Sequence, residues 1–129
     1  MVAYSFNRRF VGHIRSGAKT QTVRAERKRH ARQGEALQLY TGMRTSNCKL
    51  IGRATCAGVE PIRFDFDAQE VTIGGNPPMV ELGDLDAFAQ RDGFDDFRGL
   101  VEFWREHHSG VQQWEGVLIR WVDFQKAPL

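Results

Sequence analysis

Residues 48–59 (CKLIGRATCAGV) constrain the fold most, because they predict the longest strand of the chain and place two glycines inside it. A glycine inside a strand marks a bulge, a bend or the close approach of another backbone. Kinks of this kind, here at Gly52 and Gly58, are typical of sheets that curve or close into barrels. We therefore expect a curved sheet built around this segment.

Shorter segments elsewhere also have strand character. In chain order they are residues 3–6, 20–24, 36–40, 70–75 and 114–124. The last of them is rich in β-branched and aromatic side chains, and the one before it runs into a GGNPP turn. With the long central segment, they predict about five or six strands.

Three segments have helical patterns instead. Asn7 can cap a short first helix that Gly17 ends. Leu85, Phe88 and Ala89 share one face of a second helix, and a third follows the i, i+3, i+4, i+7 rule at Phe97, Leu100, Val101 and Trp104. Because helices do not alternate regularly with strands, a doubly wound parallel sheet is disfavoured. The expected fold is α+β: a small curved barrel with helices packed outside.

Size and composition indicate one domain over residues 1–129, with a core large enough to need no disulfide bond or structural metal. No apolar run exceeds four residues and the N-terminus lacks a secretory apolar region, so we expect no membrane association. Cys48 and Cys56 then indicate reduced thiols and a cytoplasmic location. No Cys/His set has metal-ligand spacing, so we predict no metal and no cofactor. The sequence does not specify the oligomeric state.

Charge is distributed unevenly along the chain. Residues 1–63 carry 13 Lys and Arg against 3 Asp and Glu, whereas residues 64–129 carry 5 against 13. This asymmetry indicates an electropositive face and a polyanionic partner such as RNA. The alternative is that the two halves fold together and neutralise each other.

A polar face begins where the first helix ends. Lys19 lies at that junction, and Thr20, Thr22 and Arg24 then point to one side of the strand at residues 20–24. Such a face suits the lining of a cleft. The alternative is a half-exposed edge strand with solvated threonines.

Asp92 lies seven residues after Leu85 and so continues the apolar face of its helix. A carboxylate directed at the body of the domain needs a cationic partner, for which Lys19 and Arg24 are candidates. The alternative is that Asp92 and Gly93 only form the turn that ends the helix.

Together, Lys19, Thr22 and Asp92 suit nucleophilic catalysis. A threonine hydroxyl becomes a nucleophile when a lysine of lowered pKa removes its proton and a carboxylate orients the groups. The spacing alone does not establish such a site, because a lysine and a threonine three residues apart are common.

Residues 24–32 (RAERKRHAR) form a basic run that can be a solvated loop or a phosphate-binding rim. Tyr40 and Arg44 lie just beyond, and aromatic stacking with arginine contacts suits single-stranded nucleic acid or a flipped base. We expect His30, His107 and His108 to be exposed rather than ligands. The candidate ligand-binding residues are Arg24, Arg27, Lys28, Arg29, Arg32, Tyr40 and Arg44.

Gly17, Lys19 and Arg24 form a G-x-K-x-x-x-x-R motif that resembles the ASCH domains, small members of the PUA-like superfamily. The likeness continues through residues 33–44 (QGEALQLYTGMR), 89–104 (AQRDGFDDFRGLVEFW) and 117–124 (VLIRWVDF). It therefore covers most of the chain.

The resemblance implies a PUA-like β-barrel with a cleft that binds RNA or a modified nucleobase. Some small bacterial ASCH proteins are amidohydrolases that deacetylate N4-acetylcytidine with the lysine of this motif, a threonine three residues later and a glutamate before the second helix. Lys19 and Thr22 match directly, whereas Asp92 is one methylene shorter than glutamate, a difference to which catalytic geometry is sensitive. Residues 64–78 (FDFDAQEVTIGGNPP) are additional to those small enzymes and can reshape the pocket.

Three functions are consistent with these residues. The first is binding of RNA or a modified nucleobase or nucleoside in a basic cleft. The second is an amidohydrolase in which Thr22 attacks an acyl carbonyl, Lys19 accepts the proton, and Asp92 positions Lys19 or the leaving amine. The third is a metal-independent ribonuclease in which Lys19 activates the ribose 2′-hydroxyl and Arg24 stabilises the phosphorane.

Overall fold

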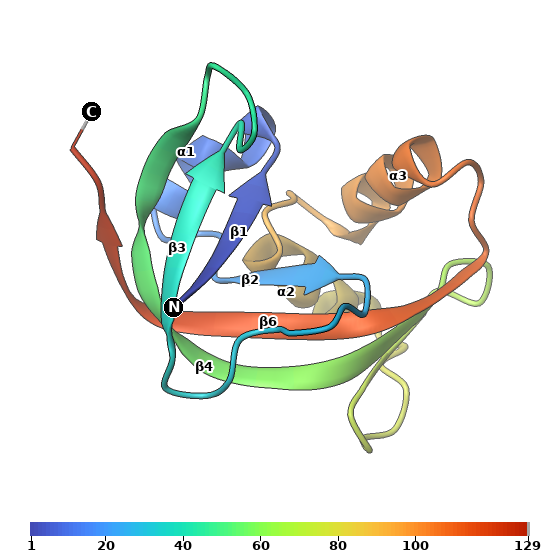
Figure 1. The fold of residues 1–129 in the computed structure, drawn as a ribbon. Helices are drawn as coiled ribbons and strands as arrows, with labels where there is room; N and C mark the ends of the chain where they lie inside the picture. The colour runs from blue at the N-terminus through green and yellow to red at the C-terminus, as the bar shows by residue number, and fades with distance from the viewer. Residues whose placement is uncertain (129) are drawn as a thin grey trace.

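Strand β4 (Lys49–Asp65) is the centre of the structure, a computed structural model that describes residues 1–128. Its first half pairs with β3 (Ala36–Thr41), its end pairs with β5 (Glu70–Ile73), and most of its length pairs with β6 (Gln113–Lys126), all antiparallel. Figure 1 shows β4 turning from upright beside β3 to horizontal beside β6. The long predicted strand is therefore present, and it continues beyond residue 59 to Asp65.

The sheet has six strands and is mixed and open. Strand β1 (Val2–Phe6) pairs parallel with β3, and β2 (Gln21–Arg24) pairs antiparallel with β6, which gives the order β1-β3-β4-β6-β2 with β5 on β4. The α+β class and the curved sheet are confirmed, but the expected barrel is corrected, because no strand pairing joins edges β1 and β2 within residues 1–128. A side chain spans this gap instead: Nη2 of Arg24 donates to the carbonyl oxygen of Ser5 at 2.6 Å.

Irregular pairing bends β4. The register with β6 shifts between Arg53 and Thr55 and again between Cys56 and Gly58. Extra residues on one strand kink it and increase its twist. At Gly52 the partner strand also comes close, since a Cβ there would lie 2.4 Å from the backbone oxygen of Gln125, whereas a Cβ at Gly58 would meet nothing within 4 Å.

Gly52→Ala should therefore lower the free energy of unfolding by about 1–3 kcal/mol, the usual result of overpacking. Gly58→Ala is the matched control on the same strand and should change it by no more than about 0.5 kcal/mol. Urea denaturation of both variants measures the difference. Equal losses would show that the close approach at Gly52 is not what excludes a side chain.

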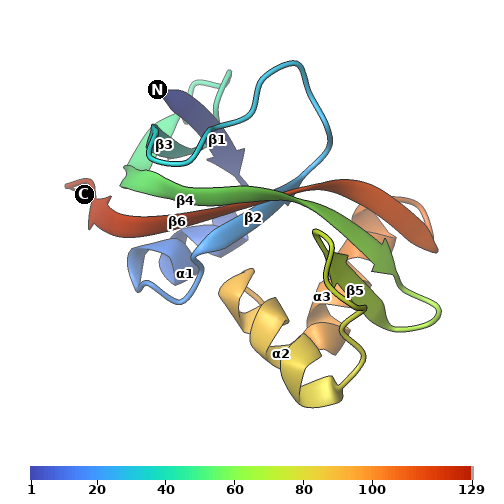
Figure 2. The same cartoon turned by 90° about the horizontal axis from the view of Figure 1, so that it is seen from below.

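The helices cover one side of the sheet. The 3-10 turn η1 (Arg8–Phe10), capped by Asn7, leads into α1 (Val11–Arg15), and the later helices are α2 (Leu82–Arg91) and α3 (Phe97–His107). Figure 2 shows α1, α2 and α3 on the same side of β4 and β6. Within residues 1–128, no helix is long and apolar enough to span a membrane.

The predicted apolar faces of the two longer helices are buried: Leu85, Phe88 and Ala89 on α2, and Phe97, Leu100 and Trp104 on α3. Phe64 of β4, with no exposed surface, is where they meet the sheet. Its ring centroid lies 6.1 Å from that of Phe88, 5.0 Å from that of Trp104 and 6.1 Å from that of Trp114. This packing fixes Trp104 and Trp114 beside the open edge of the sheet.

Candidate functional site

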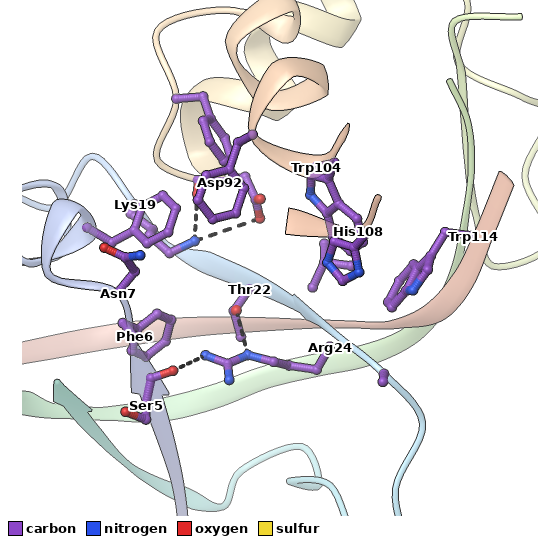
Figure 3. A pocket seen from close by; sticks show the side chains of 15 residues that line it. Ser5, Phe6, Asn7, Lys19, Thr22, Arg24, Asp92, Trp104, His108 and Trp114 are labelled. Atoms are coloured by element: carbon purple, nitrogen blue, oxygen red, sulfur yellow. Dashed lines mark hydrogen bonds and ion pairs between the residues drawn. The ribbon is translucent and has the colours of Figure 1, made fainter. Parts of the chain in front are cut away.

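A cavity of about 330 Å³ lies where the edge strands β1 and β2 approach the end of α2 and the C-terminal part of α3 (Figure 3). Its lining combines a cluster of polar side chains with aromatic walls. The lining residues are Ser5, Phe6, Asn7, Phe10, Lys19, Thr22, Val23, Arg24, Ala25, Asp92, Phe94, Phe103, Trp104, His108 and Trp114. The motif residues Lys19, Thr22, Arg24 and Asp92 therefore share one pocket.

The backbone between α1 and β2 directs Lys19 into this pocket. The amide of Lys19 donates to the carbonyl of His13 at 2.9 Å, and the amide of Thr20 donates to that of Arg91 at 2.9 Å. These bonds join the end of α1 to the end of α2. Gly93 has φ +98°, and a Cβ there would lie 2.9 Å from Cδ of Lys19, so both the conformation and the space require glycine.

Lys19 and Asp92 form a buried ion pair, with 3% and 4% of each residue exposed. Nζ of Lys19 donates to the backbone oxygen of Asp92 at 2.5 Å and lies 3.9 Å from its Oδ1. The two interpretations of Asp92 are compatible. Asp92 caps the C-terminus of α2 before the left-handed Gly93, and its side chain also points inward.

Gln21 of β2 supports the Asp92 carboxylate. Its Nε2 donates to Oδ1 of Asp92 at 3.3 Å, and the residue is only 1% exposed. Nothing in the local pattern of residues 20–24 indicated this contact, because Asp92 is distant in sequence. Gln21 is therefore a site residue that sequence reasoning missed.

Arg24 organises the opposite end of the polar cluster. Its Nε donates to Oγ1 of Thr22 at 3.0 Å, while its Nη2 bonds the carbonyl of Ser5. Within residues 1–128 no hydrogen bond joins Lys19 and Thr22, and Figure 3 shows the Lys19 amine directed at Asp92 instead. The Thr22 hydroxyl can therefore still donate its proton to a ligand.

Burial sets the protonation of these groups. It lowers the pKa of Lys19 to about 8, with Asp92 opposing the shift and Arg24 adding to it. It raises the pKa of Asp92, against the effects of Lys19, Gln21 and Arg24. It also lowers the pKa of Arg24 to about 10, so Arg24 stays charged at neutral pH. Near pH 8 the Lys19 amine can thus accept as well as donate a proton.

Aromatic side chains form walls that the sequence analysis assigned to the core or did not consider. Phe10 and Phe94 meet edge-to-face at 5.4 Å, and Trp104 and Trp114 do so at 4.6 Å. His108 is exposed, as expected, but it also lines the pocket and stacks on Trp104 with a centroid distance of 4.4 Å. The helical spacing of Trp104 indicated burial but gave no sign that a cavity lies beside it.

The remaining candidate ligand-binding residues lie outside the lining of this pocket. Arg29 pairs with Glu35, whose pKa is lowered to about 2 by that hydrogen bond first and by the amide of Arg32 second. Lys28 is exposed in the same loop. Arg27 lies over the ring of Tyr4, its Cζ 4.7 Å from the centroid. Tyr40 is half-buried on β3, and Arg44 is exposed in the turn that follows.

The architecture is similar to that of the crystal structure of ASCH from Zymomonas mobilis. The match covers 96% of this chain and 68% of that chain, with a TM-score of 0.55 and 17% sequence identity. This chain has the ASCH domain fold. A variant of that protein with a serine replaced by alanine matches at 17% identity, and one with a tyrosine replaced by phenylalanine at 16%, both with TM-score 0.55.

By sequence, no family model and no curated protein matches the chain. The expected ASCH fold is thus shown by three-dimensional similarity, at an identity that indicates the fold alone. Within residues 1–128, no group of three or more His, Cys, Asp or Glu side chains is placed to hold a metal ion. What the pocket binds or catalyses has to be argued from its own side chains.

Proposed function

We propose that the chain binds a nucleobase, as part of RNA or of a modified nucleoside, in the pocket between β1, β2 and α3. The observation that carries this proposal is the combination of aromatic walls with a polar cluster at Lys19, Thr22, Arg24 and Asp92. The cavity volume of about 330 Å³ falls in the range of small-molecule sites, roughly 300–1,000 Å³.

Base recognition needs a face to stack on and groups that bond the ring edge. Stacking of a base on an aromatic side chain contributes about 1–3 kcal/mol. Trp114 and His108, which stacks on Trp104, provide such surfaces at one end of the pocket, and Figure 3 shows both at the same end as Arg24. Arg24 and the Lys19 ammonium donate, and Thr22 both donates and accepts, so exocyclic groups of a base can be matched.

Intrinsic tryptophan fluorescence during titration with cytidine, N4-acetylcytidine, uridine, adenosine and guanosine tests the proposal. At least one nucleoside should bind, and Trp114→Leu should weaken that binding about 5–100-fold, the equivalent of one lost stacking contact. Phe124→Leu, on the same strand but outside the pocket, is the matched control. If no nucleoside or short RNA binds, or if both variants weaken binding equally, the proposal is wrong.

Amide hydrolysis is a second candidate, favoured by the lowered pKa of Lys19 beside the Thr22 hydroxyl. Neutral Lys19 would take the Thr22 proton as Oγ1 attacks the acyl carbonyl, and the ammonium would return it to the departing N4 amine. Water would then hydrolyse the threonyl ester and release the acid. Lys19 must turn from Asp92 toward Thr22 in this scheme, a change consistent with catalytic hydrogen bonds that tighten only when substrate binds.

Release of cytidine from N4-acetylcytidine, followed by chromatography, tests this second candidate. The third function, RNA cleavage, gains no separate support from the geometry. Sizing the RNA recovered from the binding experiment tests it, since shortened strands would favour cleavage over binding alone.

A further inference from the structure

Cations and aromatic rings alternate in a continuous row through the pocket. The row, called here the cation–ring row, consists of Arg9, Phe10, Lys19, Phe6, Arg24, Tyr4 and Arg27 in spatial order. Successive distances from the cationic atom to the ring centroid are 5.2, 4.7, 5.6, 4.8, 5.4 and 4.7 Å. Four of its five inner members, Phe10, Lys19, Phe6 and Arg24, line the pocket, whereas Tyr4 is buried outside that lining and Arg9 and Arg27 are the two ends.

The arginines of this row lack carboxylate partners. Within residues 1–128, Arg9, Arg24 and Arg27 are the arginines whose guanidinium groups lie over aromatic rings, and none of them forms an ion pair. Other arginines do pair with carboxylates, namely Arg29, Arg63, Arg98, Arg105 and Arg120. Apart from the pairing of Lys19 with Asp92, the positive charge of the row is therefore uncompensated.

The two ends are held in place by different contacts. Arg9 lies over three rings at once, 5.1 Å from the centroids of Phe94 and Phe103 as well as 5.2 Å from that of Phe10, and all three rings line the pocket. Its backbone amide donates to Oδ1 of Asn7 at 3.0 Å. These contacts fix a cation beside one wall of the pocket.

At the other end, Tyr4 separates Arg27 from Arg24. Nε of Arg27 donates to the carbonyl of Arg29 at 2.9 Å, and the Tyr4 hydroxyl lies 3.0 Å from Nδ1 of His30, which ties the loop after β2 to β1. The charge of Arg27 contributes to the lowered pKa of Arg24. The two like charges repel each other across the Tyr4 ring, and an anion bound at Arg27 would relieve that repulsion.

Single-stranded nucleic acid alternates anionic phosphates with aromatic bases, a pattern complementary in charge to the cation–ring row. Sites for such strands combine a positive groove that follows the backbone with aromatic side chains that stack on bases. Phosphate groups bind arginine through charge-assisted, often bidentate hydrogen bonds. A nucleotide whose base enters the central pocket extends its phosphates outward, toward the ends of the row.

We propose that Arg9 and Arg27 form phosphate subsites at the two ends of the cation–ring row, and that the ligand is a nucleotide within a single strand rather than a free nucleoside. This inference rests on the proposed base-binding function of the same pocket and adds the class of ligand. It also selects Arg27 from the basic run of residues 24–32, and assigns a role to Arg9, which lies outside that run.

The test compares ligands that share one base: the nucleoside, its 5′-monophosphate, its 3′,5′-bisphosphate and a trinucleotide, with the base chosen from the nucleoside titration. Each phosphate should tighten binding roughly tenfold, as a hydrogen bond to a charged group does. Arg9→Gln and Arg27→Gln should each reduce the ratio of bisphosphate to nucleoside affinity about tenfold, and Arg9→Lys should restore part of it. Arg8→Gln, an exposed neighbour on the same turn with no ring beneath it, should leave the ratio unchanged.

A nucleoside that binds as tightly as its bisphosphate would overturn the inference while leaving base binding intact. So would a ratio of bisphosphate to nucleoside affinity that stays unchanged in both Arg9→Gln and Arg27→Gln. If Arg8→Gln lowers this ratio as much as they do, the phosphates respond to general positive charge and not to specific subsites, which also overturns the inference. If the trinucleotide binds more tightly than the bisphosphate, the result supports a single strand as the ligand. If the two bind equally tightly, the phosphates of one nucleotide are sufficient and the strand is not the ligand. Failure of every ligand to bind would remove the base-binding function itself.

Discussion

Lys19→Met should lower the free energy of unfolding by about 3–5 kcal/mol at pH 8, because it leaves the Asp92 carboxylate buried without its cation. Methionine preserves most of the apolar stem, so the loss reports the missing charge more than a missing volume. Lys28→Met, at an exposed lysine in the loop after β2, is the control and should have almost no effect.

The loss in Lys19→Met should shrink as the pH falls. Burial already raises the pKa of Asp92 above its ordinary 3.8, and removing Lys19 raises it further. A carboxyl group whose folded-state pKa is raised binds its proton more tightly in the folded state, so the stability of the variant falls as pH rises from about 4 through the folded-state pKa. Urea denaturation at pH 5 and pH 8 measures this change.

A loss of stability independent of pH would show that Asp92 does not carry the effect. The double variant Lys19→Met, Asp92→Leu adds a second check, since an ion pair replaced on both sides by apolar groups is often tolerated. It should recover much of the stability that the single variant loses.

If the pocket hydrolyses N4-acylcytidines, Thr22→Val should reduce turnover at least roughly 10³-fold, as loss of a catalytic nucleophile does. Valine keeps the shape of threonine and removes the hydroxyl. Thr20→Val is the matched control, because Thr20 lies two residues earlier and does not line the pocket. The rate of cytidine release by each protein, measured by chromatography, distinguishes them.

The pH dependence of the same reaction has a definite sign. The reactive form of Lys19 is the neutral amine, so kcat/KM should rise about tenfold per pH unit and level off near the Lys19 pKa of about 8. Turnover that survives Thr22→Val would exclude the threonyl ester, and a profile flat from pH 6 to 9 would exclude Lys19 as the base. Either result would reject this mechanism of hydrolysis without bearing on base binding.

Local patterns in the sequence identified the strands and helices because their signals lie within single segments. Alternation and helical spacing located the edge strands, α2 and α3, and internal glycines indicated the bend of β4. The length of β4 was underestimated because its last six residues, which begin with Glu60 and Pro61 and include three charged side chains, lack strand composition but pair with β5 and β6. Whether the sheet closes into a barrel depends on how β1 and β2 lie relative to each other, and no single segment of the sequence specifies that.

The same distinction applies to the site. The spacing of Lys19, Thr22 and Arg24 along one short segment is local, and the helical spacing from Leu85 indicated that Asp92 points toward the body of the domain. Gln21 and the aromatic walls were not identified, because their roles depend on which distant segments they face. The basic run is evident in the sequence, but packing divides it: Arg29 is paired with Glu35, whereas Arg27 lies over the ring of Tyr4.

One guanidinium, that of Arg24, connects the two free edges of the sheet and also bonds the Thr22 hydroxyl. A closed barrel would have to break a ladder of backbone bonds to widen at this point, whereas here the rotation of a single side chain releases the Ser5 carbonyl. A ligand that draws Arg24 away from Ser5 would therefore remove this side-chain bond between β1 and β2. Within residues 1–128, no backbone pairing between β1 and β2 would have to break for these two edges to separate.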